Sequence, residues 1–174
     1  MRRSSILAIC MVLIILGVAG ATKDVQVYAR YSIDGHDTIN DYLNVSFLLK
    51  DEEKNIAADG SYIIMVKTDR GAVYAKKEGV LRSSDFIQKV VRWPTDQEIT
   101  TTTIRSPEVS INGSEFVNIK MNETTDKYEN LGHKTPYGSG TVSVLFIDQE
   151  GSRFVGISSI EFRDRITGDY NVEV

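Results

Sequence analysis

Apolar and polar residues alternate along much of this chain, and the alternation is clearest over residues 140–162. Val142, Val144 and Phe146 occupy every second position, a polar segment with a glycine follows at residues 148–151, and the alternation then resumes. Because successive side chains of a strand point to opposite faces of a sheet, a period of two predicts a β-hairpin. A hairpin alone is marginally stable in water, so we expect its apolar face to pack against further strands.

The same period of two predicts strands along most of the chain. Asp34-Gly35 and Asp59-Gly60 mark tight turns, because these residues tolerate the positive φ of short hairpins. Further strands are expected at residues 25–33, 42–50, 61–68, 72–76, 99–104, 115–121 and 169–174.

Three further segments are predicted from their residues. In the predicted strand 115–121, we expect Val117, Ile119 and Met121 to point inward. The charged residues 51–59 are predicted as a loop, and the polar residues 122–139 as the longest loop of the chain.

Residues 85–92 are compatible with two structures. Ser84 is a suitable N-cap for a short helix, whereas the β-branched Ile87, Val90 and Val91 suit a strand. Pro94 ends either element, because proline lacks the backbone donor. The surrounding strands favour a strand here.

About seven to nine short strands separated by turn signals predict an all-β fold, a two-sheet antiparallel sandwich. Three segments resemble the immunoglobulin-like or fibronectin-type-III-like modules of exported prokaryotic, including archaeal, surface proteins: LNVSFLLKDEEKN, ADGSYIIMVKTDRGAVY and GSGTVSVLFIDQEGSRFVGISSIEF. The Cys…Trp…Cys arrangement of antibody domains is missing. The resemblance implies a binding, spacer or assembly role and assigns no functional residue.

Residues 1–21 differ in character from the rest. Arg2 and Arg3 precede an apolar run at residues 6–18, and Ala19-Gly20-Ala21 offers the small residues that a signal peptidase accepts. A cleaved signal peptide is favoured over a retained N-terminal membrane anchor, since a membrane span needs about 20 apolar residues. Residues 22–174 then form a single β-sandwich domain, located outside the cell or at its surface.

The net charge and the cysteine content limit the classes of binding partner that we expect. The formal net charge of −4 disfavours nucleic acid, and contact with a membrane is expected only through an uncleaved N-terminal segment. Cys10 is the only cysteine and lies inside that segment, so residues 22–174 have no disulfide to stabilise them. The expected partner is a protein or another envelope component, or a glycan.

Motifs for catalysis are missing from the sequence. It contains no G-x-S-x-G, no H-E-x-x-H and no glycine-rich phosphate loop. His36 and His133 are far apart and have no cysteine partners, so no zinc site and no cofactor are expected. Acidic turns at 51–59 and 148–150 could supply oxygen ligands for calcium, although solvated hairpin turns carry the same residues.

Three sequons are legal acceptors for N-glycosylation in an exported chain: Asn44-Val45-Ser46, Asn112-Gly113-Ser114 and Asn122-Glu123-Thr124. The sequence therefore predicts an exported, non-enzymatic surface interaction or structural module. A carbohydrate- or calcium-binding module that uses its end loops is the alternative, and a small secreted hydrolase is a second one.

Overall fold

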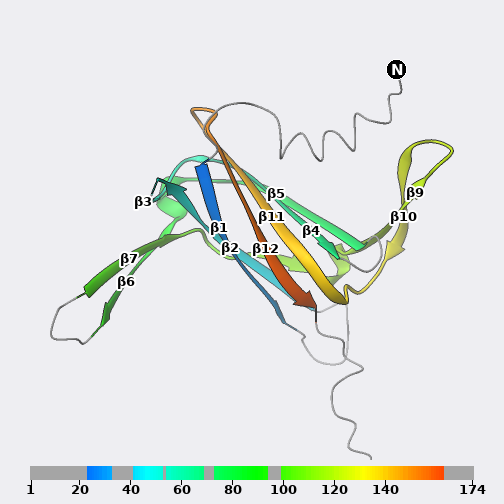
Figure 1. Cartoon of the computed structure of the whole chain (residues 1–174), viewed down its shortest axis with the longest axis horizontal. Coiled ribbons are helices and arrows are strands. Elements are labelled where there is room, and N and C mark those ends of the chain that lie inside the picture. The colour runs from blue at the N-terminus through cyan, green and yellow to red at the C-terminus, as the bar shows by residue number, and fades with distance from the viewer. Residues whose placement is uncertain (1–22, 33–40, 53, 69–72, 94–98, 163–174) are drawn as a thin grey trace, which may run out of the picture.

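The computed structural model of this chain is all-β, and it describes residues 23–32, 41–52, 54–68, 73–93 and 99–162 (Figure 1). Of residues 89–93 and 99–102 it describes the backbone only. The strands are β1 (Lys23–Ser32), β2 (Tyr42–Asp51), β3 (Lys54–Ile56), β4 (Gly60–Thr68), β5 (Val73–Leu81), β6 (Ile87–Trp93), β7 (Ile99–Arg105), β8 (Val109–Asn112), β9 (Val117–Asn122), β10 (Lys127–His133), β11 (Gly138–Asp148) and β12 (Arg153–Phe162). Two 3-10 turns, η2 (Ser83–Asp85) and η3 (Gly113–Glu115), interrupt them. In these described ranges, no helix is long and apolar enough to span a membrane.

Ten strands form one mixed sheet in the order β10-β9-β5-β4-β11-β12-β1-β2-β3, with β8 also paired to β2. Its neighbours are antiparallel except at the seam between β1 and β12, which pair in parallel through Lys23↔Phe154 and Asp24↔Val155. Strands β6 and β7 form a separate two-stranded sheet that projects from the body (Figure 1).

The large sheet curls over its own inner face. Strands β2 and β4 lie four places apart in the sheet order, which in a flat sheet would separate them by about 19 Å at about 4.8 Å per strand. The ring centroids of Phe47 on β2 and Tyr62 on β4 are nevertheless only 6.2 Å apart. Strands β1 and β2 therefore face β4 and β11 across a common core.

Aromatic side chains fill the centre of that core. Phe47 lies 6.1 Å from Phe146, and Phe86, which follows η2, meets both rings edge-on. Edge-to-face contacts of this kind are favoured by the ring quadrupoles. The aliphatic residues around them come from the inward positions of six strands: Val25, Leu43, Val45, Leu49, Ile64, Val66, Val73, Ile111, Val142 and Val144.

Several sequence-based predictions are confirmed. Residues 140–162 form the β11–β12 hairpin, and the ambiguous segment 85–92 is a strand, β6, entered through η2. The segment 99–104 pairs with β6 as β7. The predicted signal or anchor segment, residues 1–21, and the predicted last strand, residues 169–174, lie outside the described residues.

Several predictions are corrected. The large sheet is mixed, whereas a wholly antiparallel arrangement was expected, because β1 pairs in parallel with β12. Residues 122–139 are not a long loop, because they contain β10, which pairs with β9. The charged loop 51–59 contains β3, and the strand β8 was not predicted at all. The described residues therefore contain twelve strands where seven to nine were expected, because strands as short as β3 and β8 do not span enough residues to show a repeated apolar alternation.

Candidate functional site

The β9–β10 hairpin projects from one end of the large sheet (Figure 1). Only Val73↔Asn118 and Tyr74↔Val117 join it to β5, and all seven residues of β10 are exposed. Two further contacts hold its base. The backbone N–H of Lys134 donates to the carbonyl of Phe116, and the Lys77 ammonium lies 2.6 Å from the Glu115 carboxylate. The hairpin is thus anchored at its base and open along its length.

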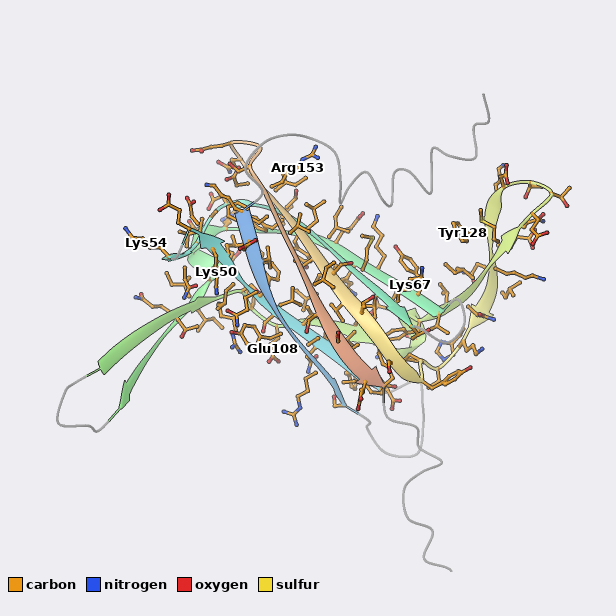
Figure 2. The ribbon with its side chains drawn as sticks, in the orientation of Figure 1. Lys50, Lys54, Lys67, Glu108, Tyr128 and Arg153 are labelled. Carbon is orange, nitrogen blue, oxygen red and sulfur yellow. The ribbon has the colours of Figure 1, made fainter. Side chains whose placement is uncertain are left out.

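One face of this hairpin is apolar. Tyr128 on β10 lies directly opposite Met121 on β9, and these residues are 42% and 37% exposed. Ile119 and Val117 follow on the same face and are half-buried. Figure 2 labels Tyr128 on the projecting hairpin, away from the curled body of the sheet.

This apolar face continues onto the large sheet through Tyr74. Tyr74 pairs directly with Val117, and residues directly opposite in a ladder point to the same face. Burial raises the pKa of the Tyr74 phenol above its ordinary value of 10.0, with a smaller opposing effect of Lys76. We call the set Tyr74, Val117, Ile119, Met121 and Tyr128 the apolar stripe.

The opposite face of the hairpin is polar. Lys120 pairs with Glu129 and Asn122 pairs with Lys127, so these four side chains share that face. The Asn122 amide also donates to the Glu129 carboxylate. The hairpin is therefore amphipathic, although no second layer of described residues covers its apolar face.

A structured turn closes the tip of the hairpin. The Asn122 side-chain oxygen accepts from the backbone N–H of Thr124 at 3.0 Å and of Thr125 at 3.2 Å. Asp126 completes the turn with φ of 53°, in the left-handed region that aspartate tolerates better than most residues. This turn fixes the register in which Tyr128 faces Met121.

The three predicted glycosylation candidates lie in different environments. Asn44 is the third residue of β2 and lies between Arg30 on β1 and Ser110 on β8. Asn112 caps η3, where its side-chain oxygen accepts from Ser114, and Asn122 lies at the tip of the projecting hairpin. Asn44 and Asn112 lie on the paired strands β2 and β8, diagonal to each other in the ladder, whereas Asn122 lies apart from both on the β9–β10 hairpin.

The acidic turns use their carboxylates within the chain. Asp51 pairs with Lys23 at 2.9 Å, Asp59 accepts from the Ser83 amide at 2.6 Å, and Asp148 accepts from the Ser152 amide at 2.7 Å. Hydrogen bonds from Ser83 lower the pKa of the Asp59 carboxyl. Among the described residues, no three of His, Cys, Asp and Glu gather where they could hold a metal ion.

Of the two histidines, the structure describes only His133. A ring nitrogen of His133 lies 3.0 Å from the Phe116 carbonyl oxygen at the base of the hairpin. His36 lies outside the described residues.

A shallow hollow of about 430 Å³ follows the seam between β1 and β12. Its lining combines the opposite charges of Asp24 and Lys50 with Gln26 and aliphatic side chains such as Val155 and Ile157. This lining contains no histidine, serine or cysteine to act as a base or nucleophile.

The sequence missed the main feature of this site. Tyr128 falls in the segment predicted as a loop, and Met121 was expected to point inward, whereas it is 37% exposed. The alternation of Val117, Ile119 and Met121 was recognised, but alternation alone does not say whether another layer covers the apolar face. The sequence did contain one signal: residues 127–130 follow β9 after four residues that can form a turn, so they can pair with β9 as the second strand of a hairpin.

No family model matches the chain, and no curated protein or solved structure shows significant similarity to it.

Proposed function

We propose that this protein is an exported, non-enzymatic β-sandwich that works as an interaction module at the cell surface, and that it binds its partner through the apolar stripe. The observation that carries this proposal is the cross-strand pair of Tyr128 and Met121, exposed on a projecting hairpin. Apolar surface that a fold leaves uncovered in contiguous patches commonly marks an interaction site.

The strand order supports an immunoglobulin-like sandwich. Strands β1, β2 and β8 correspond to A, B and E in one layer, and β12, β11, β4 and β5 correspond to G, F, C and C′ in the other. The contact between Phe47 and Phe146 joins the two layers in the core. The parallel seam between β1 and β12 makes the two layers one continuous sheet.

Export is supported by the N-terminal sequence. Arg2 and Arg3, the apolar run and Ala19-Gly20-Ala21 have the order of a secretory signal. The domain that follows contains no cysteine and has an acidic balance, which suits a soluble module. The proposed partner is a protein or another component of the cell envelope.

The composition of the stripe favours protein recognition. Tyrosine supplies a large, rigid contact surface at little entropic cost and is common among the residues that dominate binding energy. Methionine adapts its flexible side chain to an irregular partner surface. Lys120 and Glu129 keep the opposite face of the hairpin hydrated, so one face of the hairpin is left for binding.

A glycan is the second candidate partner, and one observation favours it. Tyr128 is 42% exposed on the stripe and Tyr137, near the base of β11, is 37% exposed. Exposed tyrosine rings present an apolar surface with a polar tip, which suits the faces of sugar rings. Binding on a glycan array that is lost on Tyr128→Ser and kept on Tyr137→Ser would place the sugar on the stripe.

Site-specific photo-crosslinking tests the proposal directly. A photoreactive residue is placed at position 128 on the stripe or, as the matched control, at position 129 on the polar face of the same hairpin. In intact cells, we expect a discrete crosslinked product from position 128 and little from position 129. Equal labelling from both positions would show that the apolar face is not a docking surface.

The non-enzymatic part of the proposal has its own test. Purified protein is assayed on panels of polysaccharide and peptide substrates. Hydrolysis that a single carboxylate or serine substitution abolishes would make the protein a small secreted hydrolase and overturn this proposal.

A further inference from the structure

We propose that Asn122 is the N-glycosylation site of the folded protein, and that Asn44 and Asn112 are not modified once the chain has folded. This inference depends on export of the chain and not on the docking role of the apolar stripe. It follows from the surroundings of the three sequons, which share one sequence pattern but differ in access.

The first and third sequons differ in the solvent exposure of their serine or threonine. An oligosaccharyltransferase must reach the acceptor asparagine together with the serine or threonine two residues later. In the first sequon, Val45 is 0% exposed and Ser46 only 3%. In the third, Glu123 and Thr124 are both exposed.

Backbone pairing also makes Asn44 less accessible than Asn122. Asn44 lies on a strand that is paired on both sides, with Arg30 on β1 and Ser110 on β8. Presenting it to an enzyme would require β2 to leave the sheet together with Phe47 and Leu49, which have no exposed surface. Core strands of this kind open with close to the free energy of global unfolding.

The second sequon is exposed in part but rigidly held. Gly113 is buried, and both residues flanking the sequon region, Ile111 and Phe116, are 0% exposed. The Glu115 carboxylate accepts from the Asn112 backbone N–H at 2.8 Å and also pairs with Lys77. An enzyme that draws this segment into an extended form would break these contacts and uncover Phe116.

Asn122 has none of these restraints on its C-terminal side. Residues 123–131 are all exposed, and the chain reverses here at the tip of a projecting hairpin. Opening the turn and freeing the side-chain nitrogen cost the two hydrogen bonds that the Asn122 side-chain oxygen accepts from Thr124 and Thr125, the backbone hydrogen bond from Thr125, and the exposed hydrogen bond that the Asn122 amide donates to Glu129. No buried apolar surface is lost. The end of a projecting hairpin is the part of a domain that opens at the smallest cost in free energy.

The reaction uses a polyprenyl-diphosphate-linked oligosaccharide as its co-substrate. The Asn122 side-chain nitrogen attacks the anomeric carbon of the first sugar, and the bond between that carbon and the phosphate oxygen breaks. A carbon–nitrogen bond forms, the nitrogen loses one proton, and the polyprenyl diphosphate leaves with the bonding electron pair. No oxidation or reduction takes place.

The position of the glycan has a structural consequence. Asn122 shares the polar face of the hairpin with Lys120, Lys127 and Glu129, opposite Tyr128 and Met121. A sugar chain attached there extends from the polar face and leaves the apolar stripe accessible.

The test compares folded protein with peptides. The full chain, produced in a host without N-glycosylation, is incubated with an oligosaccharyltransferase that accepts N-x-S/T and with its lipid-linked oligosaccharide. Synthetic peptides spanning each sequon give the intrinsic acceptance of each site. We expect all three peptides to be modified, whereas in the folded chain Asn122 is modified at least about tenfold faster than Asn44 or Asn112, because only its tip opens at low cost.

The native protein provides the second measurement, by mass spectrometry of glycopeptides from its own cells. Thr124→Ala should remove the glycan and leave Asn122 in place, whereas the adjacent Thr125→Ala should retain it. Comparable modification of Asn44 or Asn112 in the folded chain overturns the proposal. So does an unmodified Asn122 in the native protein, or a folded chain in which Asn122 is refused while its peptide is accepted.

Discussion

Ser106 completes the outer edge of β2 by exchanging two hydrogen bonds with Phe47. The Phe47 N–H donates to the Ser106 hydroxyl oxygen at 2.9 Å, and the Ser106 N–H donates to the Phe47 carbonyl at 2.9 Å. This exchange fills the gap between β8, which pairs with residues 42–45, and β3, which pairs with residues 49–51. A single serine, 1% exposed, thereby satisfies backbone groups that would otherwise be buried without partners.

Ser106→Ala should therefore destabilise the fold. The substitution leaves the buried Phe47 N–H without its acceptor, a loss that typically costs about 1–3 kcal/mol. Urea unfolding followed by circular dichroism measures the change in the free energy of unfolding. Ser110→Ala, at an exposed position of β8, is the control and should change it little. Equal effects of the two substitutions would show that Ser106 does not seal this edge.

Gly156→Ala should destabilise the seam between β1 and β12. A Cβ at position 156 would overlap the Val25 carbonyl group, so one of the two strands would have to shift. Overpacking of this kind costs about 1–3 kcal/mol. Thermal unfolding should show a lower midpoint for Gly156→Ala and little change for Ser159→Ala, an exposed residue of the same strand. An unchanged midpoint for Gly156→Ala would contradict the close contact at the seam.

Asp59 gives η2 a dependence on pH. Hydrogen bonds from Ser83 are the main cause that holds the pKa of the Asp59 carboxyl below its ordinary value of 3.8, and Arg82 adds to them. Because the pKa of Asp59 is lower in the folded than in the unfolded chain, its hydrogen bonds stabilise the fold fully at a pH above the unfolded pKa. This stabilisation is lost as the pH falls through the folded pKa. An NMR titration should show the Ser83 amide shifting with a midpoint below 3.8, and Asp59→Asn should abolish that transition. A midpoint at or above 3.8 would contradict the hydrogen bond.

The long strands could be predicted from the sequence, and the shortest ones could not. Strands β2, β4, β11 and β12 carry apolar residues at every second position over much of their length, so their period of two is visible in the sequence, although residues 45–49 of β2 are all buried. Strands β3 and β8 are defined by their pairing with β2. That pairing depends on the curled sheet, which no local pattern reports.

The candidate site shows the same limit. The sequon at Asn122 was visible in the sequence. That Asn44 is less accessible than Asn122 follows only from the pairing of β2 with β1 and β8, which the sequence does not show. Tyr128 had no apolar alternation around it, because β10 is exposed along its whole length. Its significance comes from Met121 directly opposite, a relationship that only the register of the hairpin supplies.

Quantitative binding to isolated cell envelopes tests the docking role of the apolar stripe most directly. The double substitution Met121→Ser with Tyr128→Ser removes the exposed pair, and Lys120→Ser with Glu129→Ser alters the opposite face of the same two strands as a matched control. We expect the stripe substitution to weaken binding at least tenfold, since truncating an aromatic residue at the centre of an interface can cost about 2 kcal/mol or more. The control should bind within about twofold of the unmodified protein, in keeping with the small contribution of exposed charge pairs. Circular dichroism must show that both variants keep the folded sheet. Unchanged binding by a folded stripe variant, or equal losses in both variants, would contradict the account.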